Sequence, residues 1–188
     1  DGAPSLAQRK ADLKKLKTAV LARSSEIEAA LNADFGNRSA YETRIMELVP
    51  IVQTINYLRR NLKSWMRPER RRVAIHFAGA RAYVVQQPLG VVGIISPWNY
   101  PLSLALIPLA TALAAGNRVM LKPSELAPAT STFLKRMLDE LYGEDRVAVV
   151  TGGADVGATF ASLPFDHLAF TGSTAVGKLV MKKAAENL

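Results

Sequence analysis

The stretch VVGIISPWNYPLSLALIPLATALAAGNRVMLKPSE, residues 91–125, decides the fold of this chain of 188 residues. It opens with a short run rich in β-branched residues, continues through a long apolar segment that ends at Gly116, and then returns to a second apolar run. A strand, a helix and another strand in this order are typical of a parallel sheet whose faces are covered by helices.

The same alternation continues to the end of the sequence. We expect strands at 90–95, 118–121, 146–150 and 167–170, and helices at 101–115, 127–141, 153–162 and 173–186. Right-handed crossovers place the carboxyl ends of parallel strands along one edge, which is where such sheets bind ligands. Residues 88–188 are therefore predicted to form a Rossmann-like α/β domain whose site lies in the strand-to-helix joints.

Two other segments precede this domain. Apolar residues recur at helical spacing over 5–33 and 42–66, so residues 1–72 are predicted to be an N-terminal helical segment. Alternating apolar residues at 73–77 and 82–86, separated by a turn with glycine, predict a β-hairpin over 73–87.

The composition excludes several classes of protein. The length suits one domain or part of a larger protein, and no apolar run reaches the roughly 18–20 residues that a membrane span needs. The N-terminal residues lack the apolar core of a secretory signal. The chain has no cysteine, which excludes disulfides, thiolate metal sites and a cysteine nucleophile within these residues. Together these features favour a cytoplasmic protein, and no metal site is predicted.

The formal net charge is +8, from 24 basic and 16 acidic residues, and much of the excess is concentrated in one cluster. The cluster consists of Arg59, Arg60, Lys63, Arg67, Arg70, Arg71 and Arg72. A nucleic-acid-binding patch is one interpretation, but no signature of an RNA- or DNA-binding module surrounds it. A contact with another subunit, or with the rest of a longer chain, is favoured, so no nucleic-acid partner is expected.

The first joint, SPWNYP at 96–101, places an asparagine between two prolines. Each proline restricts the residue before it to extended geometry, and Pro101 suits the first turn of a helix. Asn99 is thereby held at the top of the sheet, where its amide could donate hydrogen bonds to a developing oxyanion. A turn-forming asparagine without a catalytic role is the alternative.

The second joint carries Lys122 and Glu125, three residues apart and between prolines. A carboxylate beyond a strand in such a sheet accepts hydrogen bonds from ribose hydroxyls and repels a 2′-phosphate, which favours NAD over NADP. A solvated ion pair at the start of a helix is the alternative. The third joint, TGGADVG at 151–157, supplies glycines for close backbone approach but is a weak signal by itself.

The fourth joint, FTGSTAVGKLV at 170–180, matches most of the triphosphate-binding pattern G-x-x-x-x-G-K-[ST]. Leu179 stands where a hydroxyl must ligate magnesium, which argues against a triphosphate. The turn between strand and helix, with the first helical turn, is formed by Gly172, Ser173, Thr174 and Gly177. Free amides and the helix dipole there attract phosphate, so the joint favours a dinucleotide.

These joints together resemble the N-terminal part of the NAD(P)-dependent aldehyde dehydrogenase superfamily. The motifs that carry the resemblance are SPWNYPL (96–102), AAGNRVMLKPSELAP (114–128), GGADVG (152–157) and FTGSTAVGK (170–178). The stretches ADFGNRSAYET (33–43) and LKSWMRPERRRV (62–73) further resemble the subgroup that contains coniferyl aldehyde dehydrogenases and related dehydrogenases of aromatic and long-chain aldehydes. The fold implied is an incomplete aldehyde dehydrogenase fold.

The resemblance implies roles for the polar site residues. Asn99 would be the oxyanion-hole asparagine. Trp98 and Ser173 would contact the pyrophosphate of NAD or NADP. Lys122 and Glu125 would hold the adenosine ribose. The implied reaction is oxidation of an aldehyde, aromatic and similar to coniferaldehyde, to a carboxylic acid.

The resemblance also implies roles for the remaining segments. Gly153 and Gly157 would line the adenine side, and the main chain near Ile95 would complete the pocket. The hairpin would belong to the oligomerisation region of a homodimer or homotetramer. The cysteine nucleophile and catalytic glutamate of the family are not among these residues, so the chain alone is expected to be inactive. A non-catalytic dinucleotide-binding or scaffold domain and a basic nucleic-acid-binding protein are the alternatives.

Overall fold

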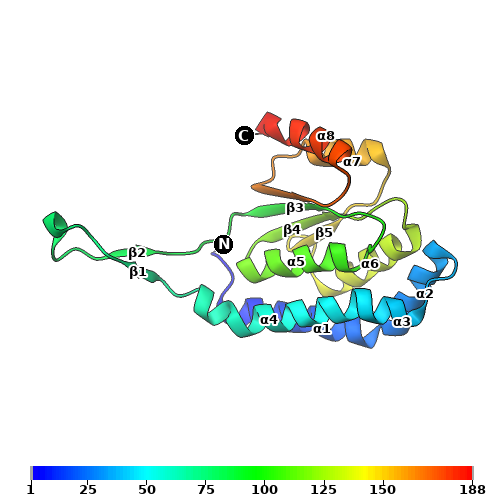
Figure 1. Ribbon diagram of the computed structural model, residues 1–188, viewed down its shortest axis with the longest axis horizontal. Coiled ribbons are helices and arrows are strands. Elements are labelled where there is room, and N and C mark those ends of the chain that lie inside the picture. Colours follow the sequence, from blue (N-terminus) through cyan, green and yellow to red (C-terminus); the bar gives the residue numbers. More distant parts are fainter. Residues whose placement is uncertain (1, 188) are drawn as a thin grey trace.

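The structure is a computed structural model that describes residues 2–187, and it has the predicted α/β architecture. A four-stranded parallel sheet lies between layers of helices (Figure 1). Its strands, in the spatial order β5-β4-β3-β6, are β3 (Val91–Ile95), β4 (Arg118–Lys122), β5 (Val147–Val149) and β6 (His167–Phe170). The predicted strand bounds agree with these to within one residue.

Helices cover both faces of the sheet (Figure 1). On one side are α5 (Ser103–Ala115) and α6 (Pro128–Leu141), and on the other are α7 (Ala154–Ala161) and α8 (Thr174–Ala184), with a 3-10 turn (Ala185–Asn187) at the end. Helix α5 is apolar around its circumference because it packs on β3 and β4 on one side and on the N-terminal helices on the other. Gly116, with φ 93°, ends α5 in the predicted left-handed conformation.

The N-terminal helical segment forms a further layer against α5 and α6 (Figure 1). It comprises α1 (Leu6–Ala22), α2 (Ser24–Phe35), α3 (Ala40–Thr43), a π-helical turn (Arg44–Leu48) and α4 (Val49–Trp65). The helices predicted at 5–33 and 42–66 are therefore confirmed. Their buried faces, which include Leu13, Leu16, Ile51, Ile55 and Leu58, form one continuous core with the sheet. No helix in residues 2–187 is both long and apolar enough for a membrane crossing.

An antiparallel ribbon projects from the body, and its first strand does not lie where the sequence predicted it (Figure 1). Strand β1 (Glu69–Arg71) pairs with β2 (Ala82–Val84), whereas Ile75–Phe77 form a 3-10 turn instead of the predicted strand at 73–77. The alternation misleads because the ribbon has no buried face: Ile75 and Phe77 are 84% and 66% exposed. All three β1 residues are charged and exposed, so β1 gives no period-two signal.

Candidate functional site

The strand register brings the four predicted joints to one edge of the sheet. Ile95 at the end of β3 is aligned with Lys122 at the end of β4 and with Phe170 at the end of β6. Hydrogen bonds continue beyond the strands: the Ser96 amide donates to the Lys122 carbonyl, and the Thr171 amide to the Ile95 carbonyl, both at 3.1 Å. The loops after β3, β4, β5 and β6 therefore form one rim.

Lys122 and Glu125 form an ion pair at this rim. Lys122 Nζ lies 2.9 Å from Glu125 Oε2, and the two side chains are 4% and 42% exposed. The hydrogen bond from Lys122 lowers the pKa of Glu125, so the carboxylate that faces solvent stays ionised. Gly157 of α7 lies beside the pair, because a Cβ there would be 3.4 Å from Lys122 Cε. An ionised carboxylate next to a surface without a side chain can accept hydrogen bonds from sugar hydroxyls.

The loop after β3 presents Trp98 and Asn99 to solvent. Trp98 is 51% exposed, and its ring centroid lies 6.4 Å from that of Phe35 in α2. The Asn99 carbonyl accepts a hydrogen bond from Arg38 Nη1 at 3.1 Å, while its exposed side-chain amide has no partner among residues 2–187. The backbone of Asn99 is thus fixed and its amide is free to donate, as an oxyanion donor requires.

The helices at the rim differ in whether a protein carboxylate already occupies their N-termini. Glu47 Oε2 accepts hydrogen bonds from two backbone amides at the start of α5, at 3.0 and 2.7 Å. Asp34 accepts two from the start of α6, both at 2.8 Å. Helix α7 has Gly153 as its N-cap and Asp155 in its first turn. A carboxyl group of the protein is already present at each of these three ends, which disfavours a phosphate there.

Helix α8 is the exception among the rim helices in the described part of the chain. Its first turn has no acidic residue, and its N-cap, Ser173, accepts a hydrogen bond from the Val176 amide at 3.3 Å. The Ser173 hydroxyl keeps its own proton for an outside acceptor. Thr174, the first residue of α8, is exposed beside it. The start of α8 is therefore the rim position best suited to phosphate.

Gly172 and Gly177 have a packing role that the sequence did not indicate. A Cβ at Gly172 would lie 2.5 Å from the Phe170 ring, and one at Gly177 would lie 3.3 Å from it. The two glycines therefore allow the start of α8 to lie directly on the ring at the end of β6.

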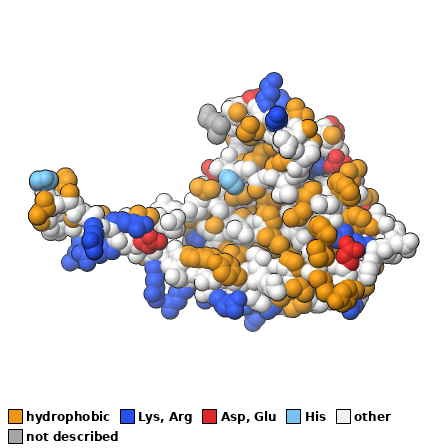
Figure 2. Space-filling model, viewed as in Figure 1, with side chains coloured by type: hydrophobic (Ala, Val, Ile, Leu, Met, Phe, Trp, Pro, Cys, Tyr) orange, Lys and Arg blue, Asp and Glu red, His pale blue; other side chains and the backbone are white. Residues whose placement is uncertain are grey.

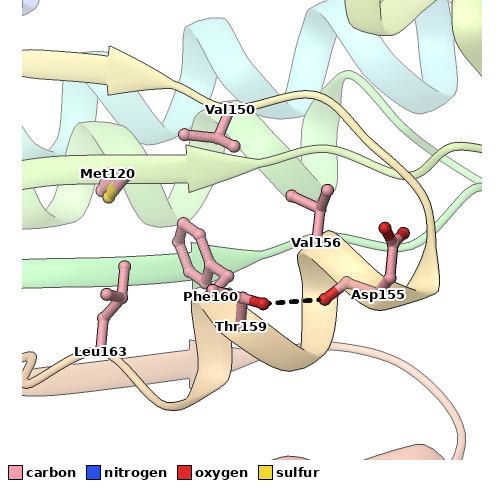
Figure 3. Close-up of a pocket in the computed structure, with 7 residues that line it drawn as sticks. All are labelled: Met120, Val150, Asp155, Val156, Thr159, Phe160 and Leu163. Carbon is pink, nitrogen blue, oxygen red and sulfur yellow. Dashed lines mark hydrogen bonds between the residues drawn. The ribbon is translucent and has the colours of Figure 1, made fainter.

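An apolar pocket of about 290 Å³ lies between α7 and the sheet (Figure 3). Val156 and Phe160 point from α7 toward Met120 of β4 and Val150, which follows β5. None of the residues predicted from the sequence lines this pocket. Two residues that line it, Asp155 and Val156, lie between the predicted contacts Gly153 and Gly157, so the pocket adjoins the predicted cofactor contacts.

Two charged residues that sequence reasoning missed, Arg38 and Glu47, meet behind the loop that carries Asn99. Arg38 Nη2 lies 3.3 Å from Glu47 Oε1. Burial raises the pKa of Glu47, and the hydrogen bond from the Ser103 amide and the charge of Arg38 oppose this rise only in part. The sequence carried one signal for this pair, a lone glutamate within an apolar helical pattern. A charge buried on such a face needs a partner of opposite charge, so this glutamate could have indicated the pair.

The arginine cluster lies away from the rim. It follows the end of α4 and the ribbon, opposite the carboxyl ends of the strands, where basic side chains gather (Figures 1 and 2). Arg71 pairs there with Glu69 at 2.6 Å. Within residues 2–187, no three His, Asp or Glu side chains are grouped so that they could hold a metal ion.

Comparison with known sequences identifies a family. Residues 3–188 match the profile of the aldehyde dehydrogenase family. The chain is 52% identical over 185 residues to a probable coniferyl aldehyde dehydrogenase of Pseudomonas aeruginosa, covering 98% of this chain and 39% of that protein. It is 46% identical over 187 residues to a coniferyl aldehyde dehydrogenase of Pseudomonas sp., covering 100% of this chain and 38% of that protein.

Solved structures are similar over the same portion. A substrate-bound state of Staphylococcus aureus AldH has a TM-score of 0.94 at 35% identity, covering 97% of this chain and 40% of that one. A Mycobacterium tuberculosis aldehyde dehydrogenase complexed with NAD+ has a TM-score of 0.85 at 30% identity, covering 98% of this chain and 38% of that one. The chain thus spans about two fifths of the length of the relatives it matches.

Proposed function

The chain belongs to the aldehyde dehydrogenase family, and on that premise we propose that it forms the cofactor-binding part of an enzyme that oxidises an aldehyde to a carboxylic acid with NAD or NADP. One observation carries the proposal. A single rim holds an exposed carboxylate, a helix start without protein carboxylates, and an asparagine with a fixed backbone and a free amide. The carboxylate can bind a ribose, the helix start can bind a pyrophosphate, and the asparagine amide can donate to an oxyanion.

The residues of the rim fit a dinucleotide. Glu125 would accept hydrogen bonds from ribose hydroxyls, and Ser173 with the amides at the start of α8 would donate to phosphate oxygens. Gly153, Gly157, Trp98 and the main chain at Ile95 would complete the contacts. When bound, NAD(P) supplies the hydride acceptor.

The Asn99 amide would donate a hydrogen bond to the aldehyde oxygen as negative charge develops on it. The 188 residues contain no cysteine, so we assign them the binding and oxyanion roles and not that of the nucleophile. The family, and relatives whose structures hold NAD, support this division.

NAD is the favoured cofactor. The ionised Glu125 carboxylate would repel a 2′-phosphate on the ribose. Lys122 does not offset this repulsion as a free cation, because its buried ammonium is already paired with Glu125.

The names of the similar proteins suggest the substrate class. One is a coniferyl aldehyde dehydrogenase and another a probable coniferyl aldehyde dehydrogenase, so we propose an aromatic aldehyde similar to coniferaldehyde. The apolar residues exposed at the tip of the ribbon support assembly into a homo-oligomer, a dimer or tetramer. A cytoplasmic location belongs to the same proposal.

Tryptophan fluorescence tests the placement of the cofactor. We expect NAD to change the emission of the full-length gene product, and Trp98→Phe to abolish that change. Trp65→Phe is the matched control, because Trp65 lies at the end of α4, in edge-to-face contact with Tyr57 at 5.6 Å between ring centroids. If Trp65→Phe alone abolishes the change, the site is misplaced. If calorimetry detects no binding of NAD or NADP, the proposed function itself fails.

A further inference from the structure

The loop that carries Asn99 rests on two buried charged side chains outside the proposed cofactor contacts. Arg38 comes from the turn after α2, and Glu47 from the π-helical turn before α4. Their side chains are 4% and 0% exposed. An ion pair in such a place is costly unless its geometry is good and its hydrogen bonds are satisfied. Arg38 Nε and Nη2 and Glu47 Oε1 make no hydrogen bond within residues 2–187, so stability does not account for the pair. Its remaining contacts suggest what it is for.

Arg38 holds the loop near Asn99. The carbon of its guanidinium lies over the rings of both Phe35 and Tyr100, at 4.7 and 4.9 Å from their centroids. From this position Nη1 donates the 3.1 Å hydrogen bond to the Asn99 carbonyl. A planar guanidinium can stack on two rings and donate within its plane at the same time, which the ammonium of a lysine cannot do.

Glu47 ties the other end of the loop to the same guanidinium. Oε2 accepts hydrogen bonds from the Leu102 amide at 3.0 Å and the Ser103 amide at 2.7 Å, while Oε1 lies 3.3 Å from Arg38 Nη2. One ion pair therefore spans the loop from Asn99 to Ser103. The π-helical turn that carries Glu47 is a rare conformation, found frequently at functional sites.

We propose that Arg38 and Glu47 are positioning residues that hold Asn99 where its amide can act as the oxyanion donor. The inference rests on the proposed function. The Asn99 amide has no partner of its own among residues 2–187, so the backbone, held by Arg38, sets its location. A misplacement of about 1 Å at a reacting centre can lower a rate by about 10²-fold.

A double-mutant cycle tests the inference in the full-length gene product, with coniferaldehyde and saturating NAD. Arg38→Lys keeps the charge opposite Glu47 but loses the stacking and the fixed hydrogen bond. We expect it to lower kcat by about 10- to 10²-fold and to leave the affinity for NAD, measured by calorimetry, unchanged. In an Asn99→Ala background, Arg38→Lys should lower kcat no further, because the group that it positions is already absent.

General damage to the structure would give a different pattern. Equal falls of kcat in both backgrounds, or an unchanged kcat in Arg38→Lys alone, would overturn the inference while leaving the oxyanion role of Asn99 intact. If Asn99→Ala itself leaves kcat unchanged, that part of the proposed function fails and the inference fails with it. Arg44→Lys is the control and should keep kcat, because the Arg44 guanidinium is exposed and pairs with Glu28 at 2.6 Å. If Arg38→Lys does not fold, Tyr100→Leu removes one stacking face and enters the same cycle.

Discussion

The Asp34 carboxylate at the end of α2 accepts a hydrogen bond from the Thr130 backbone amide at 2.8 Å, in the first turn of α6. The Ala129 amide donates to its other oxygen at the same distance. Glu47 makes the corresponding contact at the start of α5. Carboxyl groups of the N-terminal helices thus occupy two of the helix starts at the rim, whereas the first turn of α8 has no acidic residue.

Asp34→Ala should destabilise the protein by about 1–2 kcal/mol, because two amides at the start of α6 lose their acceptor. Thermal unfolding of the full-length gene product measures the loss as a lower Tm. Asp139→Ala removes an exposed carboxylate of the same helix, paired only with Lys135, and should change stability by less than about 0.5 kcal/mol. Equal Tm values for Asp34→Ala and the wild type would contradict the capping role.

Most of the fold was predictable because its signals are local. The buried strands are short apolar runs, and Gly116 and the prolines mark where helices begin and end. The ribbon was misplaced for a physical reason: apolar alternation reports a buried face, and Ile75 and Phe77 have none in this chain. The strands there pair through backbone hydrogen bonds between β1 and β2. Such bonds produce no pattern of apolar residues in β1, whose residues are all charged.

Contacts between the rim residues were predictable only where both residues lie in a single joint. Lys122 and Glu125 meet as an ion pair because a short turn joins them. The contact between Arg38 and Asn99 spans 61 positions, and the contact between Asp34 and Ala129 spans 95. Such pairs depend on how α2 and the π-helical turn pack against the sheet, and local spacing does not encode that packing.

Asn99→Ala should lower kcat by roughly 10²- to 10³-fold if the amide stabilises the oxyanion. The affinity for NAD should be unchanged, because the proposed role of the amide is to contact the aldehyde and not the coenzyme. Steady-state kinetics with coniferaldehyde measure kcat, and calorimetry measures the affinity for NAD. Asn32→Ala changes an exposed asparagine of α2 and should behave as the wild type. A normal kcat in Asn99→Ala would return this residue to the role of a turn former.

Glu125→Gln should shift the cofactor preference toward NADP. The substitution removes the negative charge that would repel a 2′-phosphate, and it leaves Lys122 without its carboxylate partner. We expect the ratio of kcat/KM for NADP to that for NAD to rise about tenfold, which corresponds to about 1.4 kcal/mol. Glu140→Gln, at a surface ion pair with Arg23, serves as the control. An unchanged ratio would remove Glu125 from the ribose site.

Gly157→Ala should change stability and cofactor affinity in opposite directions. Gly157 lies inside α7, where alanine is favoured over glycine by about 0.8–1 kcal/mol. The new Cβ would make ordinary contact with Lys122 Cε at 3.4 Å, so folding is not impaired. It would occupy the surface where we propose that the coenzyme binds, so the Kd for NAD should rise. Ala158→Gly in the same helix should lower the Tm and leave the Kd unchanged. A more stable Gly157→Ala with normal NAD binding would exclude Gly157 from the site.

The stability that the Lys122–Glu125 pair contributes should depend on pH. The hydrogen bond from Lys122 lowers the pKa of Glu125 in the folded protein below its unfolded value of about 4.3. As the pH falls, the unfolded state therefore binds the proton first, so the contribution is present above the unfolded pKa and is lost as the pH falls through the folded pKa.

The difference in Tm between the wild type and Glu125→Gln should accordingly be largest near neutral pH and disappear in acid. It should be small throughout, because the Glu125 carboxylate is 42% exposed, and solvent screening limits such a pair to about 0.2–1 kcal/mol. Glu47 acts in the opposite sense: burial raises its pKa, so its contribution is present at low pH and is lost as the pH rises through the folded value. Comparing the two proteins at each pH cancels the effect of Glu47, which both contain. If the Tm difference between the wild type and Glu125→Gln stays constant between about pH 7 and pH 3, Lys122 and Glu125 do not form this ion pair when the protein is in solution.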